Sequence, residues 1–228
     1  MSSQGREPVV EWLQAAVRVS GFLLLFLLAG CASPLSGPKL AENPPPPEQV
    51  VAARAVVSRL QDAMTEISQA GPDLGYAGRK ALITSVVLEV YDLPTMARLS
   101  YGPGWQELDV AQRALWIVTF TRFHVSSTAE VRNRYRGQTH RMLGYRLVPD
   151  GHVLIETQLD YPGRAVDFYT NYLLRPTDEG WKIIDVMSPP SVSQVAMRRA
   201  EYQTLLEKGG FSGLIEDMQK RIRRRENP

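Results

Sequence analysis

The sequence predicts an α+β fold in which helices pack on one face of a curved, four-stranded antiparallel sheet. Three observations lead to this prediction. Apolar residues recur at helical spacing between about residues 50 and 132, alternate with polar residues between about 138 and 186, and return to helical spacing after about 191. Helices, then a strand meander, then further helices place the helices on one side of the sheet.

The first predicted helix ends at Gly71-Pro72, a pair that stops helices. Its apolar positions share one helix face: Val50, Val57, Leu60, Met64 and Ile67. The second helix runs from about residue 76 to 91. Residues 81–90 at its centre are apolar on most faces, so this helix is expected to lie deep in the fold.

Two capping signals mark the next helices. Asp92 is expected to cap a short helix whose first turn carries Pro94. Asp109 and Gln112 form a predicted capping box at the start of a long helix that reaches about residue 132. On that helix, one face carries three aromatic residues: Trp116, Phe120 and Phe123.

Four segments alternate apolar and polar residues and are predicted strands, at about 138–148, 153–160, 166–175 and 181–186. Turn signals separate them: Asp150-Gly151, Tyr161-Pro162-Gly163 and Asp178-Glu179-Gly180. Asp185, in the last strand, is a candidate acceptor for a helix terminus. Helices return at about 191–207 and 211–224, with Gly209-Gly210 between them.

The one cysteine, Cys31, closes the run Leu28-Ala29-Gly30-Cys31 directly after the apolar stretch 22–28. This run resembles a lipobox, the cleavage and lipidation site of bacterial lipoproteins, which needs a thiol nucleophile with small residues before it. The apolar stretch is too short to cross a bilayer as a mature helix. We therefore interpret residues 1–30 as a lipoprotein signal peptide; the alternative is a buried structural cysteine.

Residues 31–48 are interpreted as the lipidated cysteine and a proline-rich tether, which lead into one domain at 49–228. The run Pro44-Pro45-Pro46-Pro47 favours polyproline II, and at roughly 3.1 Å per residue the tether spans roughly 50 Å. A disordered tail without a role is the alternative. Acyl chains on Cys31 predict membrane attachment on the periplasmic side of the cell envelope. Ala32 stands where an inner-membrane retention signal typically has Asp, which favours the outer membrane.

Composition argues against several other functions. A net charge of +2 predicts no nucleic-acid partner. The three histidines, His124, His140 and His152, lack metal-ligand spacing, so no metal or cofactor is expected. His124 near Ser126 or Ser127 would suggest acyl transfer, but no nucleophile-elbow motif is present, and His124 is expected to be a polar helix-face residue. The sequence therefore predicts a protein that is not an enzyme.

Three groups of residues, taken in order, resemble the signatures of one family. The first group is Tyr91-Asp92-Leu93-Pro94-Thr95-Met96-Ala97 with Gly104-Trp105, and the second is Trp181-Lys182-Ile183-Ile184-Asp185-Val186. The third is Ser191-Val192-Ser193-Gln194-Val195, followed by Gly209-Gly210-Phe211 and Leu214-Ile215. Together they resemble the MlaC family, also called the toluene-tolerance family of ABC-transporter auxiliary components, over roughly residues 50–224.

The resemblance implies a phospholipid-binding carrier of the Gram-negative envelope, with an NTF2-like cone and an apolar cavity between sheet and helices. Such carriers pass lipid between an outer-membrane lipid complex and an inner-membrane ABC transporter complex, which are the implied partners. The run Ser193-Gln194-Val195-Ala196-Met197-Arg198-Arg199 is closer to the hopanoid-associated branch, so the ligand is either a phospholipid or a polycyclic lipid. The alternative function is a lipid-free scaffold lipoprotein that binds protein.

Apolar side chains on the predicted helices and strands are the candidates to line this cavity: Val87, Val90, Tyr91, Met96, Leu99, Trp116, Phe120, Phe123, Val153, Ile155, Phe168 and Tyr172. Ordinary core is the alternative for each of them, and the more common role of such a residue, because an apolar stripe does not reveal whether the space behind it is filled.

Basic residues are the candidates for headgroup contacts. Arg132, Arg134 and Arg136, with Arg141 nearby in the sequence, could meet a phosphate through bidentate hydrogen bonds. A solvated strand face is the alternative reading of this run. The basic run 220–225 suits the C-terminal end of a helix dipole, or could dock on an anionic membrane or an acidic partner.

Overall fold

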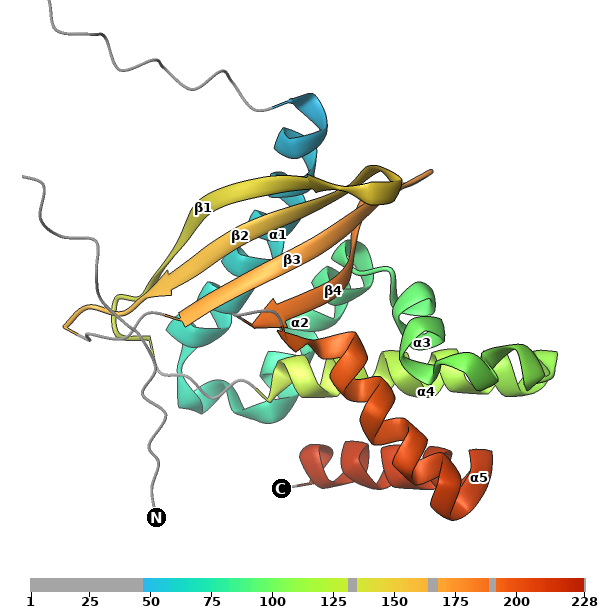
Figure 1. The fold of residues 1–228 in the computed structure, drawn as a ribbon. Helices are drawn as coiled ribbons and strands as arrows, with labels where there is room; N and C mark the ends of the chain where they lie inside the picture. Colours follow the sequence, from blue (N-terminus) through green and yellow to red (C-terminus); the bar gives the residue numbers. More distant parts are fainter. Residues whose placement is uncertain (1–46, 131–134, 164–167, 189–191, 228) are drawn as a thin grey trace, which may run out of the picture. The chain divides into compact units, whose positions relative to one another are not determined.

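A five-stranded antiparallel sheet and five α-helices make up the part of the chain that the computed structural model describes, residues 47–130, 135–163, 168–188 and 192–227 (Figure 1). The predicted α+β class is confirmed. The predicted signal peptide, Cys31 and all but the end of the predicted tether lie outside the described residues.

Four helices precede the sheet: α1 (Glu48–Ala70), α2 (Gly75–Val90), α3 (Leu93–Tyr101) and α4 (Val110–Ala129). Both predicted caps are present. An oxygen of Asp92 accepts a hydrogen bond of 3.0 Å from the Thr95 amide at the start of α3. Asp109 and Gln112 exchange bonds of 2.8 and 3.0 Å at the start of α4. Local sequence thus determines where these helices begin.

The strands follow one another across the sheet in chain order: β1 (Thr139–Val148), β2 (His152–Asp160), β3 (Phe168–Thr177), β4 (Gly180–Ser188) and β5 (Val192–Ser193). The prediction of four strands is therefore wrong by one. Val192 and Ser193, expected at the start of a helix, pair with Ser188 and Met187. Because Ser193 is the N-cap of the last helix, its backbone is extended and can continue the sheet.

An irregularity between β3 and β4 breaks the alternation that the sequence suggests. Leu173 pairs with Asp185, but the next residue, Leu174, pairs with Ile183. The resulting bulge buries both Ile183 and Val186, at 0% and 6% exposure. Asp185 is buried between them, and its side chain accepts hydrogen bonds from the Val195 amide at 3.1 Å and from the Ser193 hydroxyl. The predicted role of Asp185 as an acceptor for a helix terminus is confirmed.

The last helix, α5 (Gln194–Glu226), bends sharply at Gly210, whose φ of 60° lies in the left-handed region. The two predicted helices are thus two arms of one element. The first arm lies against α3, where Arg199 and Gln203 donate hydrogen bonds to the carbonyls of Leu99 and Tyr101. The second arm returns to α2 and α4. Ion pairs attach it there: Lys80–Glu226 at 2.6 Å and Glu130–Arg225 at 2.7 Å.

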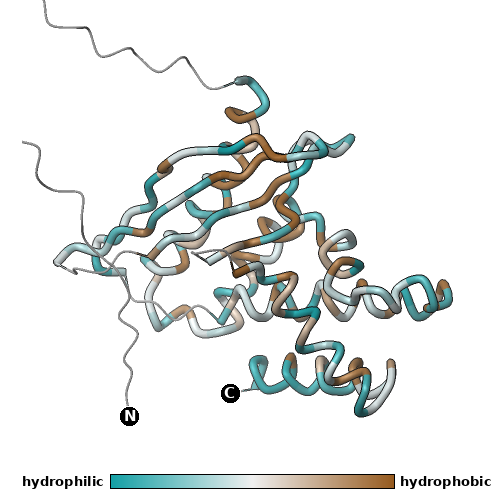
Figure 2. Tube along the Cα trace, in the orientation of Figure 1, coloured by the Kyte–Doolittle hydropathy of each residue, from teal (hydrophilic) through white to brown (hydrophobic). Residues whose placement is uncertain are grey.

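The core lies between the sheet and the helices. Helix α1 runs along the sheet, and α2, α3 and α4 complete the helical layer (Figure 1). Hydrophobic segments gather in the middle of the strands and in the helices behind them, whereas the C-terminal end of α5 is largely hydrophilic (Figure 2). In the described part of the chain, no helix combines the length and the hydropathy that a membrane span needs.

Candidate functional site

A pocket of about 300 Å³ lies where α1, α3, α4, the sheet and the start of α5 meet. Its lining comes from each of these elements: Leu60, Met64, Tyr91, Met96, Ser100, Phe120, Phe123, His124, Ser127, Thr128, Tyr172, Val186, Gln194, Val195, Met197 and Arg198. Residues far apart in the sequence therefore converge on one space.

Helix spacing and cross-strand pairing bring these residues together. Phe120, Phe123 and Ser127 are three or four positions apart on α4 and so share a face. Leu60 and Met64 on α1 are related in the same way. On the sheet, Tyr172 of β3 lies directly opposite Val186 of β4.

Most of the pocket wall is apolar and buried. Leu60, Met96 and Phe120 are exposed by 3% or less, whereas Met197 is 53% exposed. The pocket therefore opens beside the first turns of α5. Three of the lining residues are methionines, whose unbranched side chains adapt readily to a change in shape.

Three polar residues of α4 line the pocket, His124, Ser127 and Thr128, and we refer to them as its polar side. The imidazole of His124 packs edge-on against Tyr91, with ring centroids 4.6 Å apart, and stacks on Phe120 at 6.0 Å. Burial, with a smaller contribution from the charge of Arg198, lowers the pKa of His124 to about 4. The imidazole is therefore neutral at pH 7. Burial likewise raises the pKa of Tyr172 to about 12, so its hydroxyl stays protonated.

Two buried polar atoms of this side have no hydrogen-bond partner among the described residues, Nε2 of His124 and Oγ of Ser127. They belong to consecutive turns of α4. The neighbouring Thr128 differs, because its hydroxyl donates to the His124 carbonyl at 2.9 Å.

Arg198 lies at the edge of the pocket. Its guanidinium carbon is 4.8 Å from the centre of the Phe123 ring, and one of its nitrogens is 3.2 Å from Glu201. Arg225 approaches the same ring at 4.6 Å, and Arg221 shares Glu201 with Arg198. The pocket edge is thus a network of positive charges over an aromatic ring, partly balanced by carboxylates.

Of the twelve residues predicted to line a cavity, the structure brings five together in the pocket: Tyr91, Met96, Phe120, Phe123 and Tyr172. The other seven lie elsewhere: Val87, Val90, Leu99, Trp116, Val153, Ile155 and Phe168. Trp116 is completely buried and donates from Nε1 to the Ala97 carbonyl at 2.9 Å. Phe168 is 48% exposed and packs on Tyr161.

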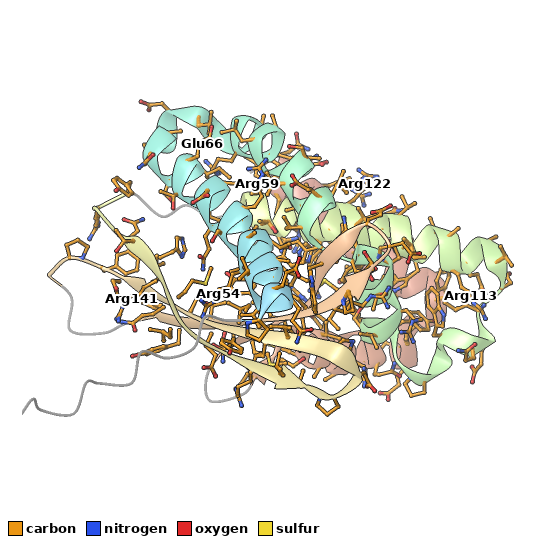
Figure 3. All side chains as sticks on the ribbon, turned by 90° about the horizontal axis from the view of Figure 1, so that it is seen from above. Arg54, Arg59, Glu66, Arg113, Arg122 and Arg141 are labelled. Carbon is orange, nitrogen blue, oxygen red and sulfur yellow. The ribbon has the colours of Figure 1, made fainter. Side chains whose placement is uncertain are left out.

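The predicted headgroup arginines do not line this pocket in the described part of the chain. Arg132 and Arg134 lie outside the described residues, and Arg136 is exposed. Arg141 pairs with Asp160 across the edge of the sheet at 3.1 Å. Figure 3 shows Arg141 on the sheet and Arg113 and Arg122 on α4, so basic side chains are spread around the fold.

Sequence reasoning missed the polar side of the pocket. His124, expected to be a polar residue on a helix face, has its ring against Tyr91 and Phe120 instead. The signal was its position, four residues after Phe120 on the aromatic face of α4. Within the described ranges, no three His, Cys, Asp or Glu side chains come together as metal ligands.

Comparisons with known proteins identify the fold and the family of this chain. A solved phospholipid-binding protein from Ralstonia solanacearum, in complex with a phospholipid, superposes with a TM-score of 0.65 at 18% identity. The match covers 77% of this chain and 99% of that one, and shows a shared fold. No curated protein matches the sequence. The model of the MlaC protein family matches residues 56–220, which is most of the chain. The chain therefore belongs to the MlaC family.

Proposed function

We propose that this protein is a lipid carrier of the bacterial envelope that holds acyl chains in the pocket between the sheet and α4. The buried apolar wall of Leu60, Met96, Phe120 and Tyr172 is the observation that carries the proposal. Membership of the MlaC family and a fold shared with a phospholipid-bound protein support it.

The free energy of transfer explains why an apolar pocket is needed. A two-chain phospholipid hides on the order of 30 methylenes, and each contributes about 0.8 kcal/mol, so exposing them to water costs roughly 25 kcal/mol. Hydrogen bonds to a headgroup cannot offset that cost, because each contributes only about 1 kcal/mol net. A carrier must therefore enclose the chains.

The size of the pocket sets how much it can enclose. A methylene occupies about the volume of a water molecule, roughly 30 Å³. The pocket of about 300 Å³ thus holds about ten methylenes, whose burial contributes about 8 kcal/mol before the entropic cost of association is subtracted. Binding both chains of a phospholipid has to widen the pocket, and its three flexible methionines are suited to that change.

The wider cellular role extends the same proposal. Acylated Cys31 and the proline-rich tether would hold the domain near the outer membrane, on the periplasmic side. From there it would transfer lipid to or from an inner-membrane ABC transporter complex and an outer-membrane lipid complex. The lipid is a phospholipid in this proposal, and a hopanoid is the alternative.

Mass spectrometry of bound lipid tests the proposal. The Cys31→Ser protein, expressed without the predicted signal peptide at residues 1–30, purified without detergent and extracted with organic solvent, should yield close to one lipid per protein. The Arg224→Ala variant is the control, because Arg224 is exposed and lies outside the pocket. Protein that carries no lipid yet captures an envelope protein would support the scaffold function instead.

A further inference from the structure

The polar side of the pocket contains an unsatisfied hydrogen-bonding capacity. His124 Nε2 and Ser127 Oγ are both buried and lack partners among the described residues, although both belong to residues that line the pocket. Burying such an atom without a hydrogen bond costs about 1–3 kcal/mol, and folded proteins keep few of them. Both residues line the pocket, so a ligand that widens it can reach the two atoms and supply the missing hydrogen bonds.

The chemistry of the two groups restricts what that can be. A serine hydroxyl and a neutral imidazole can each donate one hydrogen bond. Neither carries charge, since burial keeps the His124 imidazole unprotonated at pH 7. In the tautomer with the proton on Nε2, both groups can donate to one acceptor oxygen, and an uncharged carbonyl oxygen matches two uncharged donors.

We propose that His124 and Ser127 form a polar subsite that binds the ester carbonyl oxygen of an acylglycerol lipid. The proposal rests on the proposed lipid-binding function and assigns the part of the ligand that the pocket recognises. It makes these two residues determinants of specificity for acyl esters.

The kinds of group that line the pocket support an ester in particular. The lining combines an apolar wall that includes Leu60, Met96 and Tyr172, the polar pair on α4, and Arg198, whose guanidinium lies over the Phe123 ring. An acylglycerol phospholipid offers a matching group for each: an acyl chain, an ester and an anionic phosphate. One guanidinium nitrogen of Arg198 donates to Glu201 at 3.2 Å, and a guanidinium has five N–H groups with which it can also bind an anion.

The pair is not arranged for ester hydrolysis. A nucleophilic serine must be within hydrogen-bond reach of its base. The two atoms have no hydrogen bond to each other, since neither has any partner in the described part of the chain. We therefore expect the ester to be bound without being cleaved.

A comparison of two lipids that differ in the ester oxygen tests the proposal. Delipidated Cys31→Ser protein would be titrated with 1-acyl lysophosphatidylglycerol and with its 1-alkyl ether analogue of equal chain length, by calorimetry below the micelle concentration. The ester should bind about tenfold more tightly than the ether, as expected for hydrogen bonds to one carbonyl. Either His124→Phe or Ser127→Ala alone should lower the ratio to about threefold, and the two together should bring it close to one, with ether affinity kept within about twofold.

Ser126→Ala is the matched control. Its hydroxyl donates to the Phe123 carbonyl at 2.9 Å and does not line the pocket, so the ester preference should persist. Equal affinity of the starting protein for ester and ether would overturn the polar subsite while preserving lipid binding. Binding of neither lipid would refute the proposed function itself. If His124→Phe fails to fold, Ser127→Ala decides the question alone.

Discussion

The two ends of helix α4 differ in what they face, although one aromatic stripe runs along both. Near its start, Trp116 is completely buried against Tyr101 and Tyr202, with ring centroids 5.7 and 5.1 Å away. Its indole nitrogen is also hydrogen-bonded. Two turns later, His124 and Ser127 adjoin a pocket and leave polar atoms unpaired among the described residues.

Phe120 is the boundary between these regions. Its ring lies 5.9 Å from Trp116 and 6.0 Å from His124, so it contacts the filled core on one side and the pocket on the other. The first arm of α5 places Tyr202 over Trp116, whereas the beginning of that arm holds Arg198 at the edge of the pocket. Equally spaced side chains on one helix can therefore fill the core at one end and line a pocket at the other.

The largest effect on stability is expected from a substitution in the filled core near the start of α4. Trp116→Ala deletes a completely buried ring and should lower the free energy of unfolding by about 3–5 kcal/mol, measured by urea denaturation. Val118→Ala on the same helix is the control, since Val118 is 56% exposed and should change stability by about 0.5 kcal/mol or less. Similar losses from both substitutions would contradict a filled core around Trp116.

Replacing valine by phenylalanine at two positions, one in the pocket and one in the core, distinguishes the two regions. Val186→Phe adds a ring where the pocket has room, so it should prevent lipid retention with little loss of stability. Val87→Phe adds the same ring at a fully buried position outside the pocket, and overpacking should cost about 1–3 kcal/mol. Lipid mass spectrometry and urea denaturation would measure both variants. A Val186→Phe protein that still carries lipid would place the ligand elsewhere.

The pH dependence of stability tests whether His124 is buried and uncharged in the folded protein. Its pKa is about 4 in the folded protein and about 6.5 in the unfolded chain. Between these values the unfolded state binds the extra proton, so stability falls as the pH falls from 6.5 toward 4. This contribution is on the order of 2 kcal/mol at pH 4.5. His124→Phe should remove it, and denaturation curves that keep the same pH slope would show that the ring titrates normally.

The smallest effect is expected at the edge of the pocket. Arg198→Met keeps the apolar stem over Phe123 but removes the charge. It should lower the affinity for an anionic lipid a few-fold without changing the affinity for a zwitterionic lipid. Arg136→Met removes an equal charge from an exposed residue that does not line the pocket. Calorimetric titration of both variants would compare them. Equal weakening would favour a diffuse electrostatic attraction over a local contact.

Much of the fold could be read from the sequence because its signals are local. The Asp92 cap, the capping box at Asp109 and the stop at Gly71-Pro72 depend on neighbouring residues, and each predicted boundary agrees with the structure within a few residues. The fifth strand escaped prediction because Val192 and Ser193 gain their partners from β4 rather than from adjacent residues.

The pocket was predictable only in part. Apolar character correctly predicted five lining residues: Tyr91, Met96, Phe120, Phe123 and Tyr172. The same character also predicted Trp116 and Ile155, which are packed in the core. The sequence did not predict that His124 and Ser127 line the pocket, because a polar residue on a helix is normally exposed to water. Their burial depends on α1, α3 and the sheet, which the helix sequence does not specify.

By itself, the sequence determined the class of fold, the order of the helices and strands, and the residues that cap them, since propensity, capping and turn chemistry act over a few residues. The tertiary structure alone decided where side chains fill the space behind α4 and where they leave a pocket. That outcome depends on how volumes from five distant elements add up at one place. It therefore also decided which polar atoms were left to meet a ligand.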